Sequence, residues 1–175
     1  MAGVSRADLF RGHVAASPAA IRPPWALEDA ASFAAACDGC GRCAAACPER
    51  IIGRDRPGRP AMAFAAGGCT FCGACADACP TGALNRTGAA AAAAPWTLVA
   101  DVGARCIALS AVECRICGEH CPAGAIRFRP LGGGRRLPEV DAAACTGCGA
   151  CAGPCPAGVI TLRSNDLSQE KAACG

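Results

Sequence analysis

The amino-acid sequence predicts an α+β fold made of two small modules in tandem, with a small core organised around bound metal. Three observations support this prediction: 17 of the 175 residues are cysteine, most of these cysteines recur in a fixed pattern, and large side chains are scarce. The chain contains 5 Phe, 2 Trp and no Tyr. Burial of small apolar side chains contributes little stability, so we expect cross-links or metal centres to stabilise the fold.

The cysteines form four copies of one motif. Three copies read CxxCxxCxxxCP, and the third copy along the chain has seven residues between its first two cysteines. Three cysteines within seven residues differ from the two separated CxxC pairs of most structural zinc sites. This spacing is typical of loops that bind iron-sulphur clusters of the 4Fe-4S type. The sixteen predicted cluster and metal ligands are Cys37, Cys40, Cys43, Cys47, Cys69, Cys72, Cys75, Cys79, Cys106, Cys114, Cys117, Cys121, Cys145, Cys148, Cys151 and Cys155.

Cys106 has two interpretations because of the seven-residue gap that follows it. The gap lets Cys106 approach a cluster from a preceding strand or turn. Alternatively, Cys106 stays unbound as a small buried apolar residue. The three regular motifs therefore predict three 4Fe-4S clusters, and the altered motif predicts a fourth.

The last cysteine of each motif, which precedes a proline, is expected to serve a neighbouring site. In two-cluster ferredoxins this cysteine ligates the other cluster of the pair. On this rule Cys79 completes the site of the first motif and Cys47 completes that of the second. In the second half, Cys155 completes the site of the third motif and Cys121 completes that of the fourth. A nested pairing, first motif with fourth and second with third, is the alternative. The repeat indicates tandem ferredoxin-like modules of the bacterial 2x4Fe-4S type.

Short apolar segments flank the cysteine motifs and predict the remaining elements. Residues 27–36 predict a short helix, and residues 61–64 and 137–140 predict matching strands that each precede a motif. A second strand is expected after each Cys-Pro pair. These second strands are predicted at 51–52, 83–84, 125–128 and 159–162.

Composition divides the chain into five parts. Proline without periodicity predicts an extended arm at the start, and a run of alanines predicts a linker in the middle. The last residues, which include the seventeenth cysteine, Cys174, predict a frayed tail. The predicted parts are an N-terminal arm at 1–26, a first ferredoxin-like module at 27–88, an Ala-rich linker at 89–95, a second ferredoxin-like module at 96–163 and a flexible tail at 164–175.

Composition and motif searches also exclude several classes of function. The first residues show no secretory signal, which predicts a cytoplasmic protein in which thiols stay reduced and metal ligation is favoured over disulfides. No apolar run approaches the ~20 residues that span a bilayer. A net charge of +3 is too small to indicate a nucleic-acid partner. Nucleotide-binding, hydrolase and metalloprotease motifs are absent, so we expect no catalytic residues and no enzyme activity.

Three further segments, at 21–25 (IRPPW), 112–117 (VECRIC) and 128–130 (FRP), accompany the four motifs. With them the chain resembles, over residues 5–162, the ferredoxin-type NapF proteins of the periplasmic nitrate reductase system. The resemblance implies a cytoplasmic accessory protein whose partner is the immature catalytic subunit of that reductase. It further implies a role in maturation before export, by cluster insertion or reductive activation, with the sixteen motif cysteines as cluster ligands.

Two further questions stay open. A polyferredoxin that delivers electrons to a reductase is the alternative function, since both functions need the same clusters. The segment at 21–25 is a candidate docking element because proline-rich segments with an exposed Trp suit partner grooves. The other interpretation is that Trp25 packs on its own module.

Overall fold

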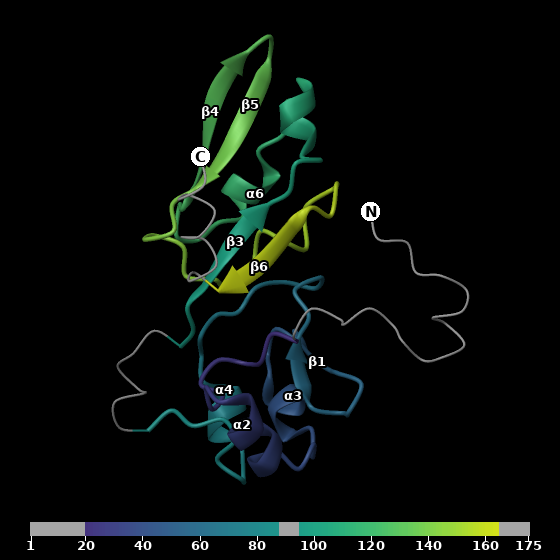
Figure 1. Ribbon diagram of the computed structural model, residues 1–175, viewed down its shortest axis with the longest axis vertical. Helices are drawn as coiled ribbons and strands as arrows, with labels where there is room; N and C mark the ends of the chain where they lie inside the picture. Colours follow the sequence, from purple (N-terminus) through teal and green to yellow (C-terminus); the bar gives the residue numbers. More distant parts are fainter. Residues whose placement is uncertain (1–19, 88–94, 165–175) are drawn as a thin grey trace, which may run out of the picture.

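The computed structural model describes residues 20–87 and 95–164, which we call the first and the second module. Both modules mix short helices with short strands, and they lie one beyond the other along the molecule (Figure 1). The elements of the first module are α2 (Ala30–Ala36), α3 (Arg42–Ala46), β1 (Ile52–Arg54), β2 (Pro60–Met62) and α4 (Ala74–Asp77). Those of the second are β3 (Leu98–Val102), the 3-10 helix η1 (Ile107–Ser110), α6 (Ile116–Glu119), β4 (Ile126–Gly132), β5 (Arg135–Val140) and β6 (Ile160–Ser164).

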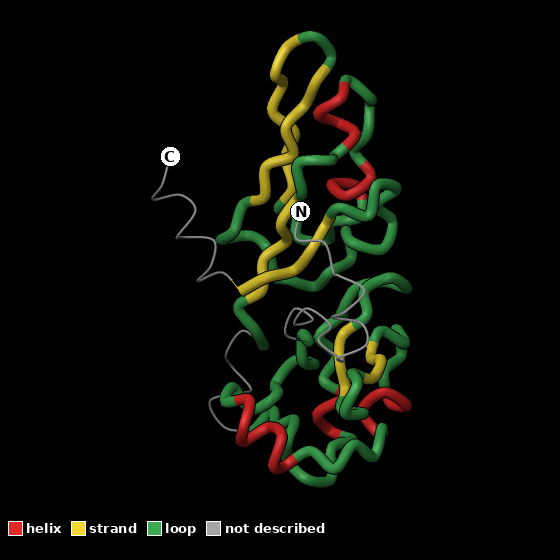
Figure 2. The backbone as a smooth tube through the Cα atoms, turned by 45° about the vertical axis from the view of Figure 1, so that its right-hand side comes forward, coloured by secondary structure: helices red, strands yellow, loops and turns green. Residues whose placement is uncertain are grey.

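A hairpin connects the two cysteine motifs within each module. In the first module β1 and β2 pair antiparallel, with Gly53 opposite Ala61. In the second module β4 and β5 form a longer antiparallel pair, which projects at the end of the molecule away from the first module (Figure 2). Residues 132–134, all glycine, turn this hairpin with φ between 57° and 81°, a region that glycine enters without steric cost.

A second strand pair closes each module by joining the segment before its first motif to the segment after its last. In the second module β3 and β6 pair antiparallel from Leu98 opposite Ser164 to Val102 opposite Ile160. In the first module the corresponding contact is a single antiparallel bridge between Ala26 and Leu84. The two modules therefore share one order of connections, although their strands differ in length.

Short helices form part of the first three cysteine motifs, where an irregular loop was expected. Cys43, Cys75 and Cys117 lie in α3, α4 and α6 respectively. The residues before α3 and α4 are Gly41 and Gly73, with φ of 79° and 81°. Because glycine tolerates this left-handed conformation, the chain can reverse within one residue and place the next cysteine on the following helical turn.

Most of the strands predicted from sequence coincide with observed elements. The helix expected at 27–36 begins only at Ala30, because the Asp29 carboxylate accepts a hydrogen bond of 2.7 Å from the Ser32 N–H and caps the helix. The segment 83–84 forms the bridge to Ala26 and no longer strand. The predicted linker is described only at Pro95, and the predicted tail only at Ser164; their other residues lie outside the described part of the chain.

The described end of the predicted arm packs on the first module. The side chains of Pro23 and Pro24 are less than 2% exposed. The Ile21 carbonyl accepts a hydrogen bond of 2.8 Å from the Met62 N–H, and the Trp25 carbonyl accepts one of 2.8 Å from the Asn85 N–H. Trp25 is half-buried. Trp25 therefore packs on its own module, as the second interpretation of this segment expected. Docking of a partner by residues 21–25 stays a prediction, and residues 1–19 lie outside the described range.

A close contact joins the two modules near their second motifs. The Cys69 N–H donates a hydrogen bond of 2.7 Å to the Cys148 carbonyl. A side chain at Gly68 would meet the backbone of Ala150 at 2.8 Å, so only glycine fits there. Trp96 packs edge-on against Phe64 and Phe71, with ring centroids 6.3 Å and 5.6 Å apart.

Among the described residues, no helix is long and apolar enough to cross a membrane.

Candidate metal centres

The sixteen predicted ligands line four cavities, four cysteines to each. We number these sites by the motif that supplies the first three cysteines. Every site also receives the last cysteine of the other motif in the same module. Site 1 has Cys37, Cys40, Cys43 and Cys79; site 2 has Cys69, Cys72, Cys75 and Cys47; site 3 has Cys106, Cys114, Cys117 and Cys155; site 4 has Cys145, Cys148, Cys151 and Cys121.

This grouping follows the exchange expected of two-cluster ferredoxins and not the nested pairing. In a nested arrangement Cys79 would lie with cysteines of the second module. It lies instead with Cys37 and Cys40, in a cavity that is lined only by residues of the first module. The β1–β2 and β4–β5 hairpins bring the two motifs of each module together, so exchange within a module needs only a short length of chain.

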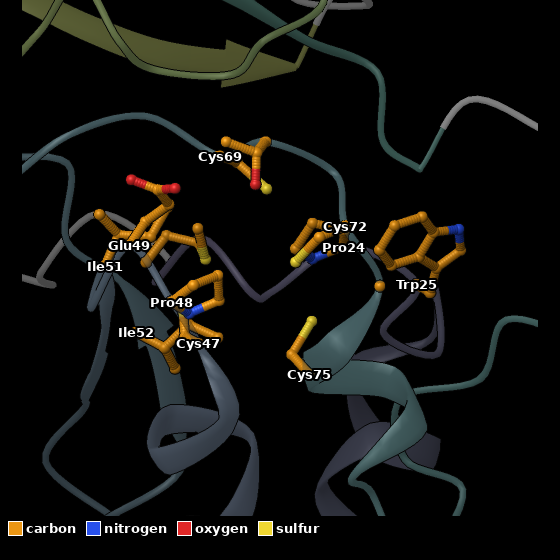
Figure 3. Close-up of a pocket in the computed structure, with 13 residues that line it drawn as sticks. Pro24, Trp25, Cys47, Pro48, Glu49, Ile51, Ile52, Cys69, Cys72 and Cys75 are labelled. Carbon is orange, nitrogen blue, oxygen red and sulfur yellow. The ribbon is translucent and has the colours of Figure 1, made fainter.

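Site 2 shows how the elements position the cysteines (Figure 3). Cys69 and Cys72 lie on the loop before α4, Cys75 lies on α4, and their sulphur atoms face a common space. Cys47 reaches this space from the end of α3. Apolar side chains, among them those of Pro24, Trp25, Ile51 and Ile52, complete the wall. The 21–25 segment thus forms part of the wall of site 2, a role that sequence reasoning did not assign to it.

Cys106 lies inside site 3, as the interpretation of Cys106 as a ligand requires. It is 9% exposed and immediately precedes η1, the short helix that accommodates most of the seven-residue gap. The Cys106 N–H donates to the Gly103 carbonyl at 3.1 Å, which forms a turn directly after β3. The chain then returns through η1 to Cys114 on the same cavity. Cys106 thus approaches from the turn that follows a strand.

Burial disfavours the thiolate form of the third cysteine in each motif. Burial raises the pKa of Cys75 and of Cys151 to about 12, and that of Cys117 to about 11. It also raises the pKa of Cys43. A neutral thiol must lose its proton to become a ligand, so metal binding at these sites releases protons and supplies the charge that offsets the buried thiolates.

Backbone amides donate hydrogen bonds to several ligand sulphur atoms. The Phe71 N–H lies 3.4 Å from Cys69 Sγ, and the Ala125 N–H lies 3.3 Å from Cys121 Sγ. The Leu84 N–H lies 3.4 Å from Cys79 Sγ. Burial raises the pKa of Cys79, but the Leu84 and Thr81 hydrogen bonds outweigh it and leave that pKa below its usual value. Such bonds orient a ligand thiolate and stabilise its charge.

The donor set fits a cluster with several iron atoms better than a single ion. All sixteen motif cysteines are free thiols. Among the described residues, no three His, Cys, Asp or Glu side chains lie close enough to bind one ion together. The ligands of a four-iron core bind different iron atoms, so their sulphurs spread farther apart than those around a single zinc ion. Four cysteines around one cavity, without a tight group of three, match the wider arrangement.

Comparison with known proteins agrees with this geometry. Residues 36–83 and 105–159 match the 4Fe-4S dicluster domain, one match for each module. The chain is 41% identical over 151 residues to the ferredoxin-type protein NapF of Haemophilus influenzae, which covers 86% of this chain and 82% of that protein. It is 38% identical over 145 residues to the ferredoxin-type protein NapF of Escherichia coli K12, covering 83% and 85% respectively.

The cysteine sites and the family match together define the class of the protein. It is an iron-sulphur protein whose two dicluster domains bind 4Fe-4S clusters. Within that class, the chain belongs to the ferredoxin-type NapF family. The family predicted from the motifs and the 21–25, 112–117 and 128–130 segments is thereby confirmed.

Proposed function

We propose that this chain is a cytoplasmic 4Fe-4S protein that assists the maturation of the catalytic subunit of periplasmic nitrate reductase before its export. The observation that carries the proposal is membership of the NapF family, at 38–41% identity over most of the chain. The four cysteine sites supply the means for either cluster insertion or reductive activation. All sixteen motif cysteines serve as ligands in this account, so the chain binds four clusters.

The cysteines, the amides and the apolar walls have separate roles in this function. When bound, 4Fe-4S clusters supply one-electron transfer. The chain's own residues hold the ligand sulphurs in place, through bonds such as Leu84 N–H to Cys79 Sγ. Apolar residues such as Ile51 and Val159 limit access of water to the sites. We propose that the chain binds clusters and donates electrons or cluster components to its partner. It has no catalytic site of its own in this account.

Exposed cysteines offer the partner a route to the sites. Cys40 at site 1 and Cys72 at site 2 are exposed, whereas the matching Cys114 and Cys148 of the second module are half-buried. Electrons or cluster components pass more readily to a partner at an exposed edge of a site than at a buried one. The exposed edges of the first module therefore support a role in which the chain meets a partner there.

Anaerobic capture with the tagged holoprotein tests this function. The targets are the catalytic subunit with its export signal and without its cluster, and the mature, cluster-loaded subunit. The account predicts selective capture of the immature, signal-bearing form. Equal capture of the mature subunit, or no capture while the reduced protein sustains nitrate turnover, would show a polyferredoxin electron carrier instead.

A further inference from the structure

One position of the cysteine repeat differs in charge between the two modules. This position lies seven residues after the last cysteine of each motif, and it is occupied by Arg54, Arg86, Phe128 and Leu162 in turn. In each motif, the side chain at this position lies against the site that contains the first three cysteines of the same motif. The four sites therefore receive two arginines in the first module and two apolar side chains in the second.

Arg54 holds its guanidinium against the loop of site 1. Its Nη1 donates to the Gly39 carbonyl at 3.0 Å and to the Gly58 carbonyl at 3.4 Å. Its Nη2 packs on Gly41, so a side chain at that position would displace the guanidinium. Gly39 and Gly41 flank the ligand Cys40, so the positive charge is fixed beside the site although the arginine is exposed. The Asp38 carboxylate also lines site 1, accepts a hydrogen bond of 3.0 Å from the Cys40 N–H and offsets part of this charge.

Arg86 occupies the matching place at site 2. Its Nη1 donates to the carbonyl of the ligand Cys72 at 3.5 Å, and its guanidinium packs on Gly73. The guanidinium also lies over the Trp25 ring, 5.5 Å from the centroid, and forms an ion pair of 3.4 Å with Asp77. Asp77 offsets part of this charge, although Asp77 is exposed and the contact is long, and Glu49 also lines the site. Arg86 is the charged side chain that bonds directly to a ligand residue of site 2 in the described contacts.

The second module places neutral side chains at this position. Phe128 lines site 3 and Leu162 lines site 4. No charged residue lines site 4. Site 3 has Arg115 near its edge, 6.0 Å from the Phe128 ring, but Glu113 pairs with that arginine at 2.9 Å. Sites 1 and 2 therefore have an arginine at this position together with acidic neighbours, whereas the lining of site 4 carries neither.

We propose that Arg54 and Arg86 each raise the reduction potential of the adjacent site, site 1 and site 2 respectively, above the value that the site would have with a neutral side chain at this position. The inference rests on the proposed binding of clusters at all four sites. Reduction adds one negative charge to a site, and a fixed positive charge nearby lowers the free energy of the reduced state. A neutral, apolar wall gives no such compensation.

The test is a potentiometric titration of the full holoprotein with dithionite as the electron donor, followed by electron paramagnetic resonance. Arg54→Leu and Arg86→Leu install the residue that site 4 carries at this position. Each substitution is expected to lower the potential of one centre, a different one in each variant, and Arg54→Lys and Arg86→Lys to retain most of the original value. Leu162→Arg is expected to raise the potential of another centre.

Arg56→Leu is the matched control, because it removes the same charge from the exposed β1–β2 turn. Among the described contacts Arg56 has no hydrogen bond or ion pair. Equal shifts in Arg54→Leu and Arg56→Leu, or an unchanged potential in Arg86→Leu at full iron content, would overturn the inference. If a Leu variant loses iron, the potentials of the Lys variants and of Leu162→Arg test the inference instead. Failure of the precursor capture above leaves these potentials unaffected, so the two proposals fail separately.

Discussion

The two modules build equivalent pairs of sites on frameworks of different strength. In the second module, β3 and β6 pair over five positions, and a long β4–β5 hairpin extends beyond them. In the first module one bridge, between Ala26 and Leu84, replaces the β3–β6 pair. There the buried Pro23 and Pro24 and the ion pair between Arg22 and Asp55 fix the incoming chain.

This difference between the modules indicates which parts of the fold determine the metal sites. Cysteine spacing and the connecting hairpin are common to both modules, and both modules exchange their last cysteines in the same way. The closing strand pair varies without changing this grouping. We conclude that the motifs and the hairpin position the ligands, while the closing segment contributes stability.

Removal of iron with a chelator under anaerobic conditions is expected to unfold the first module more completely than the second. Ligand cysteines form part of both cores, so each core loses stability with its metal. The longer ladders of β3–β6 and β4–β5 retain more structure than the three-residue β1 and β2. Hydrogen exchange read by mass spectrometry measures this difference. Equal loss of protection in both modules would contradict the comparison.

Cys79→Ala is expected to remove one centre from the first module, about four iron atoms per chain, and none from the second. Its sulphur belongs to site 1, so Cys37, Cys40 and Cys43 become accessible to alkylation in the native protein. Iron analysis and mass spectrometry of the alkylated chain give the result. Cys174→Ala, a change outside the four motifs, is the control and keeps full iron. New alkylation of second-module cysteines would instead support the nested pairing.

Gly68→Ala is expected to lower stability by about 1–3 kcal/mol, because its methyl group would overlap Ala150 at the junction between the modules. Gly67→Ala is a closely matched control, since a side chain at Gly67 meets nothing within 4 Å. Thermal unfolding of both holoproteins compares the two changes. Equal unfolding temperatures would show that the modules do not rely on this contact.

The ion pair between Arg22 and Asp55 is expected to contribute about 1 kcal/mol to the first module alone. The Arg22 Nη1 to Asp55 Oδ2 distance is 2.6 Å, and the Asp55 side chain is only 13% exposed. A double-mutant cycle with Arg22→Leu and Asp55→Asn at neutral pH isolates the coupling energy. The matching cycle on the exposed Arg129 and Glu139 pair of the second module should give a smaller value.

Local patterns made the cysteine motifs and most adjoining strands predictable. The strands at 61–64, 125–128, 137–140 and 159–162 are continuous apolar or alternating runs next to a motif, so their sequence alone marks them. The helices α3 and α4 span only five and four residues. Such segments are too short to show a helical period, which is why sequence reasoning placed these cysteines on loops.

Contacts between distant segments could not be predicted in the same way. The pairing of β3 with β6 joins residues about sixty positions apart, and nothing in either strand specifies the other. The place of Trp25 at the wall of site 2 and the fit of Gly68 against Ala150 depend on how whole modules pack. Cys106 could be predicted only in part. Its residue type indicated a ligand, but only the course of η1 shows that Cys106 and Cys114 line the same site.

Anaerobic analysis of iron and acid-labile sulphide, combined with alkylation of the native protein, tests the central claim that each module holds two complete sites. The account predicts about 16 iron and about 16 sulphide per chain, with Cys106 protected from alkylation. About 12 iron per chain with Cys106 alkylated would show that site 3 stays empty. That result would contradict the equivalence of the two modules.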